Sequence, residues 1–105
     1  MRYKLKDLAR VIRSKNSGPY ELTFDVMFRD YDMYRRVADA KVFTPASFAA
    51  LYGIPAEDVM EIVCFEPAKA VKITIARPLC SGSPGETDVY GAQQHAPLMG
   101  MEFEI

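Results

Sequence analysis

The sequence predicts an α+β fold, a two-layer sandwich in which helices pack on one face of a mainly antiparallel sheet of about four strands. Residues 20–28 alternate between apolar and polar side chains, which is the strand period. Two capped helical segments, residues 30–40 and 44–53, follow together, and two apolar strand segments come after them. At 105 residues the chain has the usual length of one domain, so we expect a single domain over residues 1–105.

The first segment, residues 4–14, is predicted to be an amphipathic helix. Apolar residues recur there at helical spacing, at Leu5, Leu8, Ala9 and Ile12. Small residues and a proline at 15–19 end this helix, because proline cannot continue the hydrogen-bond ladder. The element order is therefore helix, strand, two helices, two strands, loop and strand.

The strand at 20–28 should be half-buried, with its apolar face formed by Tyr20, Leu22, Phe24, Val26 and Phe28. On its polar face, Asp25 is expected to be solvated or paired. Asp30 or Asp32 can cap the next helix, which should bury Met33, Tyr34 and Val37.

The helix at 44–53 has clear boundary residues. Thr44 suits the N-cap, Pro45 suits the first helical position, and Gly53 can end the helix in a left-handed turn. Residues 55–59 add a further helical turn. These boundary residues predict where the helix begins and ends.

Residues 60–65 and 70–77 are predicted to be strands joined by a short connection. The first is apolar on both faces, which favours a central position in the sheet and a buried Cys64. The second alternates, with Val71, Ile73 and Ile75 on one face. Residues 101–105 alternate again and should form a short final strand.

Charge and composition exclude several classes of function. The net charge is −1 and there is no basic tract, so we expect no nucleic-acid partner. No signal peptide and no apolar run long enough to span a membrane is present, and the two cysteines do not make a disulfide scaffold. We therefore expect a cytoplasmic protein without a membrane partner.

The segment 81–98 is the most unusual part of the chain, because it gathers nearly every polar side-chain type with three glycines and two prolines. A polar loop between strands contributes little to a core, so functional groups are expected here. Proton transfer could be carried by Asp88, Tyr90 and His95. Each of the three also has a purely structural interpretation, as a group that holds the loop by hydrogen bonds.

Substrate binding is predicted for a larger set of polar groups in and beside this segment. A backbone nest around Ser81 and Ser83 could hold an anion, and the amides could bind a carbonyl or carboxylate group. The cationic patch at 13–19 could bind an anionic substrate, or could stabilise a helix end instead. The candidate substrate-binding residues are Arg13, Lys15, Asn16, Ser81, Ser83, Glu86, Thr87, Gln93 and Gln94.

A metal site is not predicted, because Asp88 and His95 lack a second histidine or a ligating cysteine pair. No cofactor is expected either. Cys80 lies beside the segment, but no spacing requires it to pair with His95, and we interpret it as an incidental thiol.

Two stretches of the chain resemble one small bacterial family. They are residues 4–9 (KLKDLA) with 13–19 (RSKNSGP), and residues 82–98 (GSPGETDVYGAQQHAPL). The family is a domain of unknown function that is encoded beside, or fused to, proteins of the acyclic terpene utilisation type. The resemblance covers almost the whole chain.

This resemblance implies a small partner subunit in catabolism of carboxylic acids or their thioesters, within a two-component enzyme such as a hydratase or other lyase. The first hypothesis is thus an enzyme subunit whose segment 81–98 completes a site shared with the larger protein. The second is a non-catalytic interaction module in which that segment docks through apolar anchors at Val89, Tyr90, Pro97 and Leu98. The third is a structural domain that self-associates as a homo-oligomer.

Overall fold

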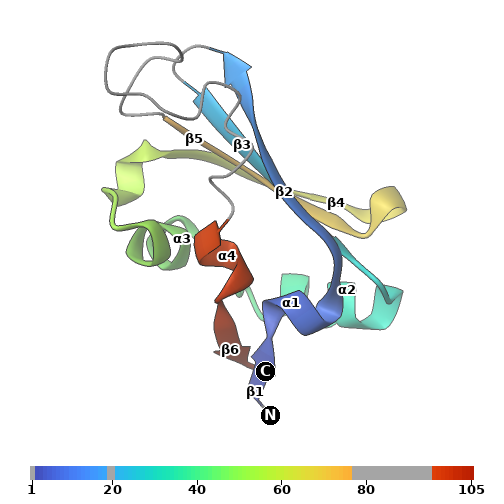
Figure 1. Ribbon diagram of the computed structural model, residues 1–105. Helices are drawn as coiled ribbons and strands as arrows, with labels where there is room; N and C mark the ends of the chain where they lie inside the picture. Colours follow the sequence, from blue (N-terminus) through green and yellow to red (C-terminus); the bar gives the residue numbers. More distant parts are fainter. Residues whose placement is uncertain (1, 19–20, 77–95) are drawn as a thin grey trace.

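The computed structural model describes residues 2–18, 21–76 and 96–105 (Figure 1). Its main element is an antiparallel sheet of four strands in the order β2-β3-β5-β4. The strands are β2 (Ala9–Gly18), β3 (Glu21–Phe28), β4 (Val59–Phe65) and β5 (Ala70–Ala76). Helices pack against one face of this sheet, so the predicted α+β fold is confirmed.

The helices are short. They are α1 (Leu5–Leu8), α2 (Tyr31–Asp39), α3 (Pro45–Tyr52) and α4 (Ala96–Met99), with single 3-10 turns at η1 (Ala56–Asp58) and η2 (Glu66–Ala68). The turn η1 confirms the helical turn expected at 55–59. None of the described helices is long and apolar enough to cross a membrane.

The two ends of the chain lie side by side in a separate two-stranded sheet (Figure 1). Here β1 (Arg2–Lys4) pairs with β6 (Glu102–Glu104), so that Tyr3 lies opposite Phe103. The final strand expected at 101–105 is thus present, although its partner is the N-terminal strand rather than the main sheet.

The helix predicted over residues 4–14 is wrong beyond its first turn. Only α1 is helical, and the chain from Ala9 onward is the edge strand β2, paired with β3. Without β2, one whole side of β3 would present unpaired backbone N–H and C=O groups beside a buried core. Pairing this central strand overrides the helical spacing of the apolar residues.

The core lies between the sheet and the helices. The strands β3 and β5 contribute their alternating apolar residues, and α3 contributes Phe48. The Phe48 ring stacks on Tyr52 at 4.5 Å and meets Phe24 of β3 edge-on at 5.1 Å. The fully buried or nearly buried members include Leu5, Phe24, Val26, Phe28, Tyr34, Val37, Phe48, Val71, Ile73 and Leu98.

The boundaries of α2 and α3 agree with their predicted caps. The Met33 N–H donates to the Asp30 carboxylate at 3.3 Å, which caps α2. In α3, Ser47 N–H donates to the Thr44 hydroxyl at 3.1 Å, and Thr44 N–H donates to the Ser47 hydroxyl at 2.9 Å. Gly53 ends α3 at a φ of 65°, a left-handed conformation that glycine adopts without strain.

The strand β4 is an edge strand, not the central strand predicted from its two apolar faces. Most of its side chains are exposed, including the free thiol of Cys64, which we expected to be buried. Central positions belong to β3 and β5 instead. The position of a strand depends on which segments pair beside it, and apolar composition alone does not determine that order.

Candidate functional site

Nine of the predicted site residues belong to segment 77–95, which lies outside the described residues. They are Ser81, Ser83, Glu86, Thr87, Asp88, Tyr90, Gln93, Gln94 and His95. The structure does place the two ends that flank this segment. Ala76 is the last residue of β5, and Ala96 is the first residue of α4.

The C-terminal flank is anchored in the core. Leu98 of α4 is completely buried, so it cannot serve as the exposed docking anchor that the interaction hypothesis assigned to it. Pro97, beside it, is exposed. Burial raises the pKa of Tyr52 on α3, and a hydrogen bond with the backbone of Leu98 acts in the opposite direction. This contact joins α3 to α4 at the point where the polar segment ends.

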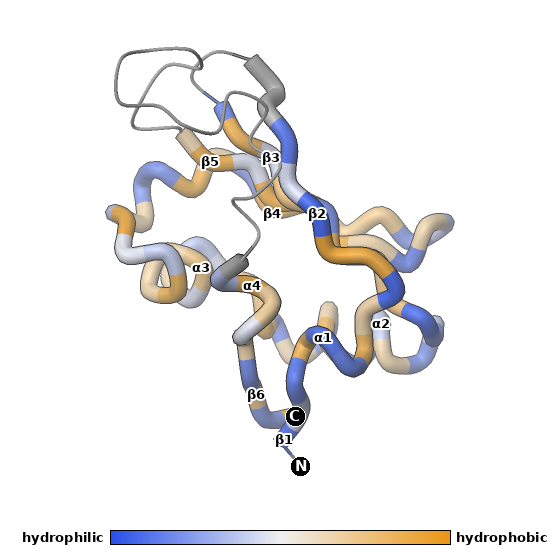
Figure 2. Tube along the Cα trace, viewed as in Figure 1, coloured by the Kyte–Doolittle hydropathy of each residue, from blue (hydrophilic) through white to orange (hydrophobic). Residues whose placement is uncertain are grey.

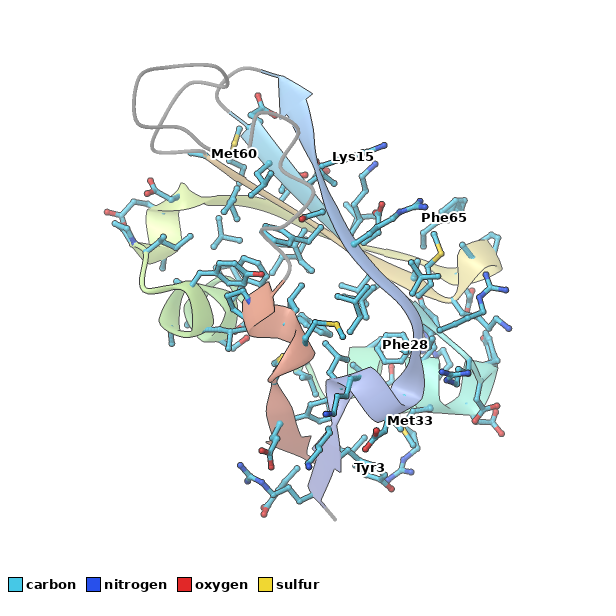
Figure 3. All side chains as sticks on the ribbon, viewed as in Figure 1. Tyr3, Lys15, Phe28, Met33, Met60 and Phe65 are labelled. Atoms are coloured by element: carbon cyan, nitrogen blue, oxygen red, sulfur yellow. The ribbon has the colours of Figure 1, made fainter. Side chains whose placement is uncertain are left out.

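Arg13 and Lys15 lie on strand β2, on the side of the four-stranded sheet away from the helices. We call this side the open face. Strand register aligns Arg13 with Asp25 of β3 and then with Lys72 of β5. The next row, toward the end of β5, aligns Lys15 with Thr23 and Thr74. Figure 3 shows Lys15 projecting from this side of the sheet.

Asp25 lies between two cations on the open face. Its side chain is only 12% exposed, and the Nε of Arg13 donates to its Oδ2 at 3.1 Å. Lys72 lies next to Asp25 on the opposite side, so a single buried carboxylate has a cation on each flank. The expectation that Asp25 would be solvated or paired is therefore met by pairing.

The cationic patch predicted at 13–19 thus exists in part, but on a strand instead of a helix end. Arg13 is 55% exposed and Lys15 is also exposed, while Lys72 adds a cation that is not among the predicted site residues. The sequence does indicate that Lys72 lies on the polar face, because it stands between Val71 and Ile73 in an alternating strand. Asn16 belongs to the same strand, opposite Leu22, and its side chain is outside the described set.

The open face can bind an anion, but the described residues do not complete a catalytic arrangement. The three cations lie there beside two carboxylates, Asp25 and Glu61 of β4, which aligns with Thr74. Exposed cations of this kind suit a carboxylate or phosphate group. Among the described residues, no group of three or more histidine, cysteine, aspartate or glutamate side chains could hold a metal ion.

Two pockets occur elsewhere on the described part of the chain. The larger, of about 670 Å³, lies between α3 and β6, and its walls include Ser47, Leu51 and Met101. The smaller, of about 260 Å³, lies between β4 and the α2–α3 connection. Arg13 and Lys15 line neither of these two pockets, and both side chains are exposed.

A third group of polar residues joins α2 to the end of β4. The Tyr31 hydroxyl donates to the Glu66 carboxylate, and Arg35 lies 3.7 Å from the same carboxylate. The hydrogen bond to Glu66 and the negative charge of this carboxylate raise the pKa of Tyr31. Since all three side chains are exposed, we interpret this cluster as a structural contact between α2 and the end of β4, and not as a catalytic site.

Comparison with known proteins gives one match. A family profile described as a domain of unknown function, DUF4387, matches residues 5–102. No match is found among curated proteins or among solved structures. The match extends from the start of α1 to the first residue of β6 and includes the four-stranded sheet, all four described helices and segment 77–95.

Proposed function

We propose that this chain, which belongs to the DUF4387 family, is the small subunit or accessory domain of a two-component catabolic enzyme. Its larger partner would be a protein of the acyclic terpene utilisation type. The substrate would be a small carboxylic acid or acyl thioester, and the reaction a hydration or another lyase reaction. Segment 81–98 would contribute to a site shared by the two proteins.

The observation that carries this proposal is the position of the open-face cations relative to Ala76, the last described residue before the polar segment. The row of Lys15, Thr23 and Thr74 lies two residues from Ala76, the last described residue before segment 81–98, which begins five residues further along the chain. Two residues of strand span about 7 Å, which is within the length of one small substrate. In this proposal, Arg13, Lys15 and Lys72 bind the carboxylate or phosphate groups of a substrate, and segment 81–98 follows in sequence from the end of β5 beside them.

A shared site is favoured over a self-contained one. The cations Arg13 and Lys15 are exposed, and they line neither of the two pockets described above. A small domain with an open binding surface needs another surface to exclude water from a substrate. The larger subunit would supply that surface.

In this proposal the polar segment supplies the chemistry. Asp88 would act as general base at carbon, and His95 would transfer a proton to or from the leaving hydroxyl group. Tyr90 would donate a hydrogen bond to the carbonyl oxygen as negative charge develops on it. Gln93 and Gln94 would orient the carboxyl or thioester group, together with Ser81, Ser83, Glu86 and Thr87.

The test is an assay of the complex of the chain with its larger partner on hydroxy acids and enoyl thioesters. We expect His95→Ala and Asp88→Asn to lower kcat while the complex stays intact. Lys15→Gln and Lys72→Gln should raise KM by roughly threefold to fivefold, as loss of one exposed charge contact implies. Lys6→Gln, which changes an exposed cation on α1, is the matched control. Full turnover by both His95→Ala and Asp88→Asn would refute the catalytic part.

The second candidate, a non-catalytic interaction module, is supported by exposed apolar residues beside the cations. Val63 and Phe65 of β4 are 40% and 51% exposed on the open face. Apolar residues bordered by charges are typical of interfaces. Under this alternative, Tyr90→Ala or Phe65→Ser abolishes complex formation, whereas His95→Ala leaves turnover unchanged.

A further inference from the structure

The edge strand β4 is open to pairing along one side. It has β5 as its neighbour on one side, and the described part of the chain places no strand on the other. Backbone N–H and C=O groups of alternate residues on the free side point outward, which allows an additional strand to bind.

This edge also lacks the charged residues that usually protect a sheet edge. Glu61 is the single charge between Val59 and Phe65, and Figure 2 shows the hydrophobic colouring of the strand. The register shift lies at the start of β4, between Val59 and Glu61, so the pairing with β5 is regular from Glu61 to Phe65. An exposed apolar edge of this kind favours pairing with another strand.

The 260 Å³ pocket adjoins the same edge. Ile62 and Cys64 of β4 line it from the helix side of the sheet, where they pair with Ile73 and Val71. Because Cys64 is exposed, the layer of helices ends before it covers this part of β4. The remaining walls come from α2, β5, the α2–α3 connection and the first residue of α3, through Val37, Ala38, Lys41, Phe43, Thr44, Pro45 and Val71.

Lys41 is the charged residue in the lining of this pocket. Its backbone is left-handed, with a φ of 53°, and it is held there by hydrogen bonds from Lys41 N–H to Ala38 C=O and from Val42 N–H to Val37 C=O. The ion pairs formed within the described residues do not include Lys41. The pocket thus combines apolar walls with one available positive charge, which complements an aliphatic side chain and a carboxylate.

We propose that β4 and the pocket beside it form a recognition groove for an extended, acidic peptide segment of a partner protein. The segment adds to β4 as a fifth strand, places an aliphatic side chain between Ile62, Phe43 and Val71, and sets a carboxylate against Lys41. Main-chain hydrogen bonds then supply affinity, and the pocket and the cation supply specificity. The groove lies apart from the open-face cations, and the proposal requires no catalytic role for the chain.

A second copy of this chain fits the groove less well. Two β4 strands pairing about a two-fold axis would bring a second Lys41 to the same side, and like charges would meet. The acidic residue within β4, Glu61, faces the opposite side of the sheet, where it pairs with Thr74. Glu66, at the end of the strand, is already bound by Tyr31 and Arg35. The positive charge of Lys41 therefore favours an acidic segment of another protein over a second copy of this chain.

The test is a titration of the nitrogen-15-labelled chain with synthetic hexapeptides, followed by NMR. The peptides alternate threonine with valine, isoleucine or leucine and end in an amidated aspartate; control peptides carry asparagine in its place. We expect amide shifts at residues 61–65 and 41–44 with at least one peptide. Asparagine in the peptide and Lys41→Gln in the chain should each weaken peptide binding roughly threefold to fivefold. The two changes combined should weaken binding no more than either change alone.

Two more variants keep the test specific. Cys64→Leu fills the pocket from an exposed position and should abolish binding, whereas Lys6→Gln on α1 should leave it unchanged. Absence of shifts with every peptide overturns the proposal. Shifts caused by sodium hexanoate within the pocket alone, with no peptide binding, identify a small-molecule site and overturn it as well. Shifts of β4 on simple dilution of the chain identify self-association, with the same consequence.

Discussion

Replacing Arg13 by glutamine will destabilise the fold because it leaves a buried carboxylate without its nearest cation. The Arg13 Nε lies 3.1 Å from Oδ2 of Asp25, whose side chain is only 12% exposed. Lys72 stays beside Asp25 after the substitution, but as a neighbour in the strand register. The carboxylate would then lose a directed, charge-assisted hydrogen bond.

The magnitude follows from distance and exposure. Two unit charges at this separation attract by roughly 1–5 kcal/mol for effective dielectric constants between those of water and of a protein surface. Because the Arg13 side chain is 55% exposed, solvent screens the pair strongly. We therefore expect a net loss of about 1–2 kcal/mol in the free energy of unfolding.

A double-mutant cycle measured by urea unfolding tests this value. The four proteins are wild type, Arg13→Gln, Asp25→Asn and the double variant. We expect the double variant to be about as stable as Asp25→Asn alone, which gives a coupling energy of about 1–2 kcal/mol. Additive effects, with coupling below about 0.3 kcal/mol, would show that the pair contributes nothing to stability.

Three further predictions concern the helix layer. Thr44→Ala removes one half of the capping box of α3 and should lower the free energy of unfolding in urea by about 1 kcal/mol. An unchanged urea midpoint would contradict the capping role. Phe48→Ala removes a ring packed against Phe24 and Tyr52, and should cost about 3–5 kcal/mol, whereas a loss below about 1 kcal/mol would mean that this part of the core is loosely packed. Burial raises the pKa of Tyr52 above its ordinary value of 10.0, so the unfolded chain ionises first and stability falls as pH rises above that value. Tyr52→Phe should reduce this alkaline loss, as measured by thermal unfolding in a pH series, and an identical pH profile would refute the assignment.

Several elements could be predicted because their own residues specify them. The alternation at 20–28 places Phe24 and Val26 toward the core, and the structure buries both completely. Asp30 and Thr44 accept hydrogen bonds from the first turns of α2 and α3, so these helix starts depend on contacts three residues apart. Local sequence is sufficient when the deciding contacts are local.

The edges of the sheet could not be predicted in the same way. Residues 9–14 have helical spacing of apolar side chains, yet they form a strand because β3 needs a partner along its second side. The composition of β4 is typical of a central strand, yet β5 pairs with both β3 and β4 and leaves β4 at the edge. Both outcomes depend on pairing between distant segments.

The same distinction applies to the candidate site. The sequence alone determined the α+β class, the caps of two helices, the core face of β3 and β5, and the concentration of polar groups in segment 81–98. Tertiary structure alone decided that Arg13 pairs with Asp25, that Lys72 joins Arg13 and Lys15 on one face, and that β4 and Lys41 border a common pocket. Strand pairing brings these residues together from distant positions in the sequence. The alternation of side chains within one segment does not determine which strand will pair with it.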